Sequence, residues 1–347
     1  MKRLKLPNTI RILAIFVYPF CASWAWADGG QQYANLGECQ LESGETILEC
    51  RLGYRTFGNL NADESNAILI PTWFSGDSQD LIDLKVIGPE GVIDSSRFFV
   101  IAVDAFGNGV SSSPSNSGSY EPGDFPAVSI ADMVNSQHRL LTEKLGIHHL
   151  AAVVGSSMGG MQAFQWAVSY PRFMDKAVSI VGSPKLTSYG LLLWSTQLAV
   201  IDALIDQPGG DLSARRINSD VSMLNLQTPS YVVGTTPSDQ FETLMATSEK
   251  SAELMPSRDR ALQLNAMIHH DISAKFDGSW DRVRDRIKAQ LLIAVATQDH
   301  MVNPAPALAL ASVLGARTLR LEGPCGHMAA LCEREKLQPA IASFLAE

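Results

Sequence analysis

The sequence has no excess of positive charge. It contains 27 lysines and arginines against 36 aspartates and glutamates in 347 residues, a formal net charge of −9. No stripe of basic residues follows any part of the chain. Proteins that bind nucleic acid or anionic membrane surfaces need such clustered basic residues to neutralise phosphates. The charge pattern therefore argues against both kinds of partner.

Motifs for metals and nucleotides are also missing. The sequence has no H-E-x-x-H and no phosphate-binding P-loop, and Gly107-Asn108-Gly109 lacks the third glycine of a dinucleotide-binding loop. His269-His270-Asp271 is better interpreted as the polar end of a helix than as a set of metal ligands. We therefore expect no metal and no other cofactor.

The apolar run near the N-terminus is too short to span a membrane. The stretch from Ile12 to Trp26 has about 15 residues and contains Pro19, whereas a spanning helix needs about 20. Basic residues precede it, and Ala25-Trp26-Ala27 follows as a cleavage site. These features predict a signal peptide at residues 1–27 and a periplasmic or secreted protein with no stable membrane insertion after cleavage. An uncleaved membrane anchor is the alternative.

Cysteine is scarce, with five residues in the chain. Cys21 would leave with the signal peptide, and Cys39, Cys50, Cys325 and Cys332 would remain. An even number in an oxidising compartment indicates two disulfides. A turn between Cys39 and Cys50 suggests a cross-strand bond in a hairpin, and the other two cysteines flank a histidine. Four buried free thiols are the alternative.

Short apolar runs alternate with helical patterns, which predicts an α/β fold with a mostly parallel sheet flanked by helices. A capping box at Ser129 and Asp132 predicts a helix that runs to Leu145. The strand rhythm stops after Pro184, so we expect a core at 28–184 and 287–347 with a helical lid inserted at 185–286. The predicted strands are Asn66–Pro71, Phe98–Val103, Leu150–Val154, Ala177–Val181, Leu291–Ala296 and Ala316–Leu321, and the predicted lid helices are Leu191–Leu204, Gln240–Leu254 and Arg258–His270.

The most informative motif is Gly155-Ser156-Ser157-Met158-Gly159-Gly160. It follows a predicted buried strand and precedes a helical pattern, which is the order of a nucleophile elbow in a serine acyl-transfer enzyme. Small neighbours let the strand and helix approach closely while the hydroxyl of Ser157 stays exposed. The backbone N–H of Met158 would then stabilise an oxyanion. The alternative is a glycine-serine string that arose by chance.

A serine nucleophile needs a base and a residue that orients it. Asp299 follows the strand predicted at Leu291–Ala296, and His327 follows the strand predicted at Ala316–Leu321. This is the chain order Ser, Asp, His of α/β-hydrolases. Asp299 as a helix cap and His327 as an ordinary loop residue are the alternatives. The neighbouring His300 is not expected to take part.

The second oxyanion donor should come from a loop after an early strand. The segment from Pro71 to Asp77 fits that position, and the backbone N–H of Phe74 is our candidate donor. The bulky Trp73 on the same loop is expected either to form a wall of the acyl pocket or to belong to the core.

Several motifs resemble the homoserine O-acetyltransferase family of α/β-hydrolases. They are Tyr54–Gly58 (YRTFG), Gly123–Pro126 (GDFP), Asp132-Met133-Val134 and, most specifically, Ser157–Ala163 (SMGGMQA) with Trp166-Ala167. The resemblance extends over residues 36–184 and, less closely, 286–335. It implies an α/β-hydrolase fold and acyl transfer from acyl-CoA to an alcohol.

The sequence departs from this family where the acceptor should bind. Met328 follows His327 where the family has an aspartate for the amino group of the substrate, and Gln197 stands in a helix where the family has an arginine for its carboxylate. We therefore predict a hydrolase of small or short-chain esters, with Trp73, Gln197 and Met328 at the substrate pocket. An acyltransferase is the alternative, and a non-catalytic binding protein is a third interpretation. A homodimer stays open.

Overall fold

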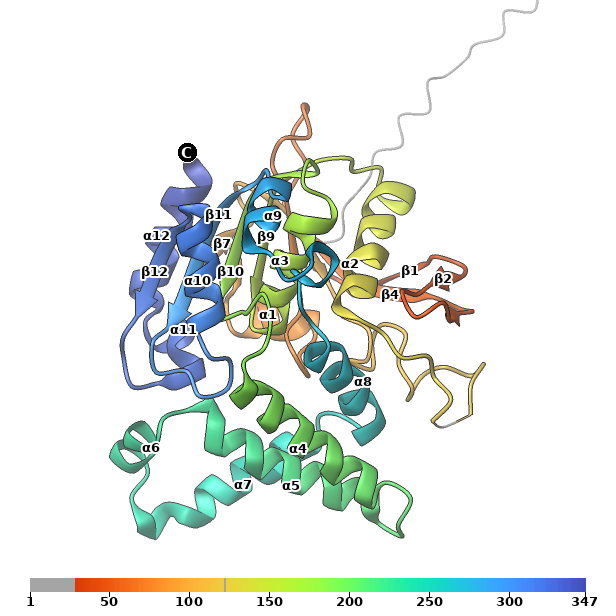
Figure 1. The fold of residues 1–347 in the computed structure, drawn as a ribbon, viewed down its shortest axis with the longest axis vertical. Helices are drawn as coiled ribbons and strands as arrows, with labels where there is room; N and C mark the ends of the chain where they lie inside the picture. Colours follow the sequence, from red (N-terminus) through yellow and green to blue (C-terminus); the bar gives the residue numbers. More distant parts are fainter. Residues whose placement is uncertain (1–28, 122) are drawn as a thin grey trace, which may run out of the picture.

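The computed structural model describes residues 29–121 and 123–347. The predicted signal peptide at residues 1–27, with Cys21, lies outside the described residues. Figure 1 shows a sheet with flanking helices in the upper part and a separate group of helices below it.

An eight-stranded sheet forms the centre of the fold. Six strands run parallel to one another, namely β8, β5, β9, β10, β11 and β12. On the outer side of β8, β4 and β1 extend the sheet in antiparallel pairing. In spatial order the strands are β1 (Gln32–Asn35), β4 (Arg51–Phe57), β8 (Phe99–Val103), β5 (Ala67–Pro71), β9 (Leu150–Ser156), β10 (Met174–Ile180), β11 (Gln290–Ala296) and β12 (Arg317–Leu321).

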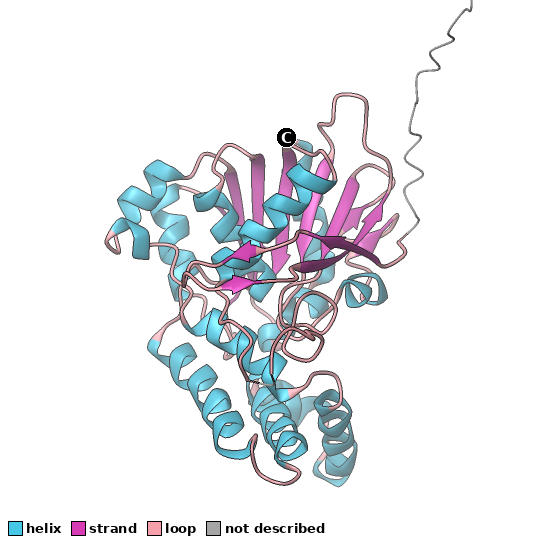
Figure 2. Cartoon of the chain, turned by 90° about the vertical axis from the view of Figure 1, so that its right-hand side faces the viewer, coloured by secondary structure: helices cyan, strands magenta, loops and turns pink. Residues whose placement is uncertain are grey.

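The central strands are mostly apolar because helices cover both faces of the sheet (Figure 2). Every residue of β5 and β8 is buried, for example. The six predicted strands correspond to β5, β8, β9, β10, β11 and β12, and these predictions are confirmed. Strand β12 lies at the edge of the sheet, and only its last residue, Leu321, is buried.

Two apolar clusters pack on opposite faces of the sheet. One contains Met133 of α2 (Ile130–Arg139), Phe164 of α3 (Met158–Ser169) and Leu310 of α10 (Ala305–Leu314). The other contains Leu81 of α1 (Ser78–Asp83) and Ile341 of α12 (Arg334–Ala346). Short elements complete the core: α9 (Trp280–Arg286), the parallel pair β6 (Ile87–Gly88) and β7 (Ile93–Asp94), 3-10 turns at Ala274–Phe276 and Gly326–Met328, and α11 (Ala329–Cys332).

The capping box predicted for α2 is present. The side chain of Ser129 accepts a hydrogen bond from the backbone N–H of Asp132, and the Asp132 carboxylate accepts one from the backbone N–H of Ser129. After Arg139 the helix continues as a π-helical turn, Leu140–Lys144, and ends at Leu145 as predicted.

The group of helices between β10 and α9 occupies the lower part of Figure 1. Helix α4 packs against α5 and α8, and α5 packs against α7. Helices were predicted where α4, α7 and α8 lie, whereas α5 and α6 were not predicted. The bounds are α4 (Ser188–Leu204), α5 (Gly210–Leu226), α6 (Pro229–Thr235), a 3-10 turn at Ser238–Gln240, α7 (Phe241–Ala252) and α8 (Ser257–Ile268).

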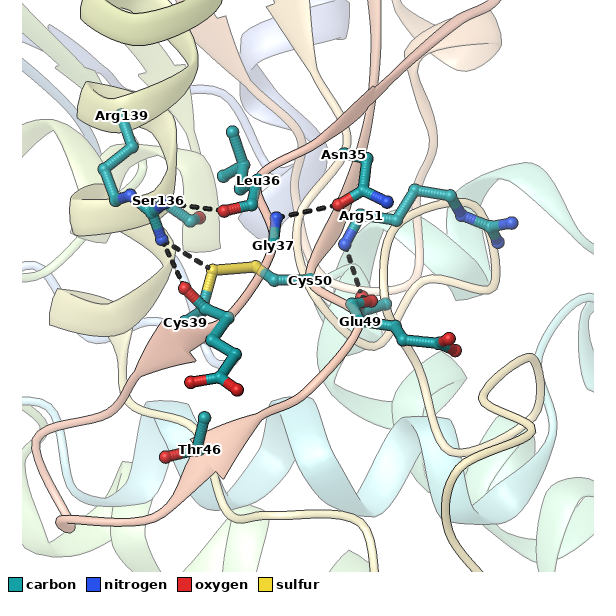
Figure 3. Close-up of a disulfide and its surroundings, with 12 residues drawn as sticks. Asn35, Leu36, Gly37, Cys39, Thr46, Glu49, Cys50, Arg51, Ser136 and Arg139 are labelled. Carbon is teal, nitrogen blue, oxygen red and sulfur yellow. Dashed lines mark hydrogen bonds between the residues drawn. A yellow bond between two sulfur atoms is a disulfide. The ribbon is translucent and has the colours of Figure 1, made fainter.

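Both predicted disulfides are present, Cys39–Cys50 and Cys325–Cys332, with Cα–Cα distances of 5.6 and 6.5 Å. The Cys39–Cys50 bond was predicted to join the two strands of a hairpin, and this prediction is wrong. Cys39 of β2 (Cys39–Gln40) pairs in register with Ile47 of β3 (Thr46–Ile47), and Cys50 lies beyond that strand. The bond therefore ties the hairpin to the start of β4 (Figure 3).

Candidate active site

Ser157 lies between the end of β9 and the start of α3, where the chain reverses direction sharply. Its backbone has φ 55° and ψ −119°, a region that residues with a side chain rarely occupy. Strain of this kind persists only where the surrounding structure enforces it, and it concentrates at functional sites.

Tight contacts around this turn require glycine on both sides of Ser157. A Cβ atom added to Gly155 would lie 2.0 Å from the carbonyl oxygen of Gly159. A Cβ at Gly159 would lie 2.6 Å from the carbonyl oxygen of Pro71, at the end of β5. The strand, the helix and the neighbouring strand end therefore approach closely enough to hold the serine in its strained conformation.

His327 and Asp299 form a hydrogen-bonded chain with Ser157. The Nε2 atom of His327 lies 2.9 Å from Ser157 Oγ, and its Nδ1 atom lies 2.7 Å from Asp299 Oδ2. The side chains of His327 and Asp299 are only 8% and 1% exposed. The three residues come from separate loops that follow β9, β11 and β12. The structure thus brings together the three side chains that the sequence placed at strand ends.

The second carboxylate oxygen of Asp299 has its own partners. Oδ1 accepts hydrogen bonds of 2.8 Å from the backbone N–H groups of Met301 and Val302. Helix α10 begins later, with Pro304 as its N-cap, so Asp299 is not the cap of that helix. The two backbone bonds fix the carboxylate in the position where its Oδ2 atom meets His327.

The loop that carries His327 is held at several points. The Cys325–Cys332 disulfide spans it, and Gly326 adopts a left-handed φ of 63°. The hydroxyl of Thr228, the N-cap of α6, donates a 2.5 Å hydrogen bond to the carbonyl of Pro324. The loop that carries His327 is therefore closed by its own disulfide and is also hydrogen-bonded to the helical segment.

The predicted oxyanion donors lie on two elements that meet near Ser157. Met158 is the first residue of α3, and the first N–H groups of a helix have no partner within the helix. Phe74 lies in the turn after β5, next to Ser75, which has a φ of 62°.

Two glutamines hold the Phe74 turn in place. Gln162 of α3 donates to the carbonyl of Thr72, and Gln263 of α8 accepts a hydrogen bond from the backbone N–H of Ser75. Gln263 also donates to the carbonyl of Phe106, and both glutamines are fully buried. No sequence pattern singles out Gln263, because its role depends on α8 packing against a loop nearly 190 positions earlier.

A cavity of about 300 Å³ opens onto Ser157 and His327. Its lining is mostly apolar and includes Trp73, Phe74 and Met328, three of the residues that sequence analysis assigned to the site. The volume is at the lower end of the range for small-molecule sites. The sheet core supplies one side of the wall, and helices α4, α5 and α8 supply residues of the other.

Gln197 does not reach this cavity, contrary to the expectation from the sequence. It is fully buried in α4, and its Oε1 atom accepts hydrogen bonds of 3.4 and 3.2 Å from Arg260 of α8. The position facing the cavity is taken by Arg260, which sequence analysis did not identify. The sequence alone does not show how two helices cross, and it therefore could not predict that Arg260 of α8 lies beside Gln197 of α4.

The Arg260 guanidinium lies against neutral groups. Its Cζ atom is 4.9 Å from the centre of the Phe74 ring, and its Nη2 donates a 2.9 Å hydrogen bond to the hydroxyl of Ser222. Burial lowers the pKa of Arg260 to about 10. The side chain therefore remains positively charged at neutral pH.

The described residues contain no cluster of three or more histidine, cysteine, aspartate or glutamate side chains suited to a metal ion. His269-His270-Asp271 follows the end of α8, with His269 as its C-cap. His270 is buried, and burial lowers its pKa to about 4. The neighbouring His300, next to Asp299, is exposed.

Similar proteins include both esterases and acyltransferases. The family described as the alpha/beta hydrolase fold matches residues 90–332. A probable esterase of Corynebacterium glutamicum is 30% identical over 93% of this chain and 97% of that protein. A homoserine O-acetyltransferase of Methanococcoides burtonii is 29% identical over 89% of this chain and 72% of that protein. The solved structure of an acetylester hydrolase from Corynebacterium glutamicum superposes with a TM-score of 0.82 at 28% identity, covering 91% of this chain and 95% of that one.

These similarities confirm two predictions, the fold class and the resemblance to homoserine O-acetyltransferases.

Proposed function

The chain belongs to the α/β-hydrolase fold family, and from this premise we propose that it hydrolyses small or short-chain esters through an acyl-enzyme on Ser157. The observation that carries the proposal is the hydrogen-bonded chain from Ser157 through His327 to Asp299 at the wall of a small apolar cavity. Geometry of this kind is the recognised basis of serine acyl-transfer catalysis.

In the first half of the reaction, Ser157 Oγ attacks the ester carbonyl carbon while His327 Nε2 takes its proton. Asp299 holds the imidazole in the orientation that leaves Nε2 facing the serine, and it stabilises the imidazolium. The backbone N–H groups of Met158 and Phe74 donate hydrogen bonds to the oxyanion. The bond to the alcohol then breaks, and His327 returns the proton to the leaving alcohol.

In the second half, water replaces the alcohol. His327 takes a proton from the water molecule as its oxygen attacks the acyl carbon of the Ser157 ester. The same oxyanion donors act again, and the bond to Ser157 Oγ breaks with return of the proton to the serine. The products are the free carboxylic acid and the unmodified enzyme.

The cavity favours water over homoserine as the acceptor. Among the described residues that line it there is no aspartate or glutamate to meet an ammonium group, and Met328 stands directly after His327. Homoserine carries an ammonium group, and a charge-assisted hydrogen bond of this kind contributes roughly 1.5–3 kcal/mol. Loss of that partner supports hydrolysis.

Acyl transfer from acyl-CoA to an alcohol is the second candidate, supported by the similarity to a homoserine O-acetyltransferase. A non-catalytic binding protein is a third, and the completed Ser157–His327–Asp299 chain argues against it. Labelling of Ser157 by a fluorophosphonate would exclude an inert serine.

The test compares p-nitrophenyl esters of short acids with acetyl-CoA plus homoserine. We expect ester hydrolysis without homoserine, and we expect Ser157→Ala to abolish it while the protein stays folded. Fast release of CoA that depends on homoserine would overturn the hydrolase assignment. A panel of acyl lengths, run with the same protein, would define the acyl group.

We also propose that residues 185–286 act as a lid and that the protein is exported after removal of residues 1–27. Lid residues such as Met223 and Arg260 line the cavity, which supports the first proposal. Two disulfides suit an oxidising compartment, which supports the second. No helix among residues 29–121 and 123–347 is long and apolar enough to cross a bilayer.

A further inference from the structure

Arg260 is a buried cation that faces the cavity without a counter-ion. It is 9% exposed, and among the described residues no carboxylate lies within ion-pair distance of it. Burial of a charge is costly unless the charge is paired and hydrogen-bonded. Buried arginines of this kind therefore call for an explanation.

Neutral groups orient the guanidinium but leave part of it available. Nε and Nη2 donate to Gln197 Oε1, and Nη2 also donates to Ser222 Oγ. For Nη1 the described part of the chain offers no hydrogen-bond partner. The Phe74 ring packs against the guanidinium at 4.9 Å and fixes its plane beside the turn that carries the oxyanion donor.

The other arginine at the cavity is already occupied. Arg334 is half-buried, and its two terminal nitrogens donate to the carbonyls of Leu84 and Lys85. Among described lining residues, Arg260 is thus the cation with an unused donor, and no acidic side chain offsets it. The electrostatics of the cavity favour an anion and disfavour an ammonium group.

We propose that Arg260 binds a carboxylate carried by the ester itself, so that the substrate class is a small ester with one free carboxylate and no amino group. The proposal rests on the hydrolase function proposed above. A planar guanidinium with a free N–H edge is suited to carboxylate recognition. The carboxylate belongs either to the acid part of the ester or to its alcohol part.

The experiment measures kcat/KM for matched pairs of charged and neutral esters. Mono-p-nitrophenyl glutarate against p-nitrophenyl valerate tests a carboxylate on the acid side. O-acetylglycolate against ethyl acetate tests one on the alcohol side. We expect the wild-type protein to prefer the charged member of one pair by roughly tenfold to a hundredfold. Equal rates within both pairs would overturn the inference and leave the hydrolase function standing.

The variant Arg260→Met should lose this preference mainly through a higher KM for the charged ester. Arg260→Lys, which keeps the charge but not the planar fork, should retain part of it. Arg258→Met is the matched control, because Arg258 lies on the same helix and pairs with Asp206 outside the cavity.

A purely structural role for Arg260 makes a different prediction. Arg260 joins α4, α5 and α8 through Gln197 and Ser222, so its loss could loosen the helices. In that case Arg260→Met would slow charged and neutral esters equally, and the inference would be wrong. If Arg260→Met does not fold, the wild-type preference and Arg260→Lys decide. If no ester is hydrolysed by wild-type protein, the proposed function fails and this inference with it.

Discussion

Individual residues at the site are fixed by contacts that leave them little freedom. Ser157 is held at a positive φ by the glycines around it, and Asp299 is held by two backbone N–H groups. His327 is held by hydrogen bonds at both of its ring nitrogens. Such preorganisation means that the hydrogen bonds do not have to be assembled during the reaction.

Asp299→Asn should lower kcat by about 10⁴-fold, and Ser157→Ala by about 10⁶-fold, by analogy with other serine triads. The asparagine keeps the shape of the side chain but can donate to His327 Nδ1, which favours the tautomer that cannot act as a base toward Ser157. Steady-state kinetics on a short p-nitrophenyl ester would measure both. His300→Ala is the control, since that exposed neighbour should be dispensable. A near-normal kcat for Asp299→Asn would mean that another acid orients the histidine.

At the scale of elements, strands that are buried on both faces could be predicted from apolar runs alone. The loops after β9, β11 and β12 could then be assigned because the parallel strands end at the same edge of the sheet. What could not be predicted is which helix faces which. Gln263 and Arg260 act through the packing of α8 on a distant turn and on α4, and no local pattern reports that packing. The hairpin register likewise placed Ile47, not Cys50, opposite Cys39.

Removal of the Cys325–Cys332 bond by substitution of both cysteines with serine should lower kcat by roughly 10- to 100-fold, because small displacements of a catalytic group are costly. The matched control is the Cys39→Ser, Cys50→Ser variant. Both loops are short, so each variant should lose about 2–3 kcal/mol of unfolding free energy. Kinetics and thermal unfolding would separate the two effects. An equal loss of kcat in both variants would count against a local role of the Cys325–Cys332 bond in catalysis.

At the scale of the whole molecule, the helical segment leaves the core and returns to it at adjacent points. The backbone N–H of Ile272 donates to the carbonyl of Pro184, and Lys185 and Asp271 form an isolated antiparallel β-bridge through their backbones. His270 is buried beside this junction, and its Nε2 atom has no hydrogen-bond partner among the residues that the structure describes. A proton added there would introduce a charge into the interior.

The stability of the protein should therefore depend on the pH through His270. Burial lowers its folded pKa to about 4, against an ordinary value near 6.5, while Asp271 and the backbone of Ser183 oppose the shift. Between these two pH values the unfolded state binds more protons than the folded state. The contribution of His270 to the free energy of unfolding is therefore fully present above a pH of about 6.5 and is lost as the pH falls toward 4. The loss should approach about 3 kcal/mol at about 1.4 kcal/mol per pKa unit.

Urea unfolding of wild type and His270→Gln from pH 7 to 4 would measure this contribution. The buried Asp104 and Asp259, whose pKa values burial raises, change stability in the opposite sense, and they cancel in the difference between the two proteins. His269→Gln, at an exposed neighbour, should behave like wild type. Parallel pH profiles for wild type and His270→Gln would refute the assignment.

We propose that water, and not an alcohol, releases the acyl group from Ser157. Hydrolysis of a short acetyl ester in ¹⁸O-labelled water, with excess homoserine present, tests it directly by mass spectrometry of the products. We expect acetate that carries one ¹⁸O atom, formed at a rate that does not depend on homoserine, and we expect no such product from Ser157→Ala. O-acetylhomoserine as the main product, or undiminished turnover by Ser157→Ala, would contradict it.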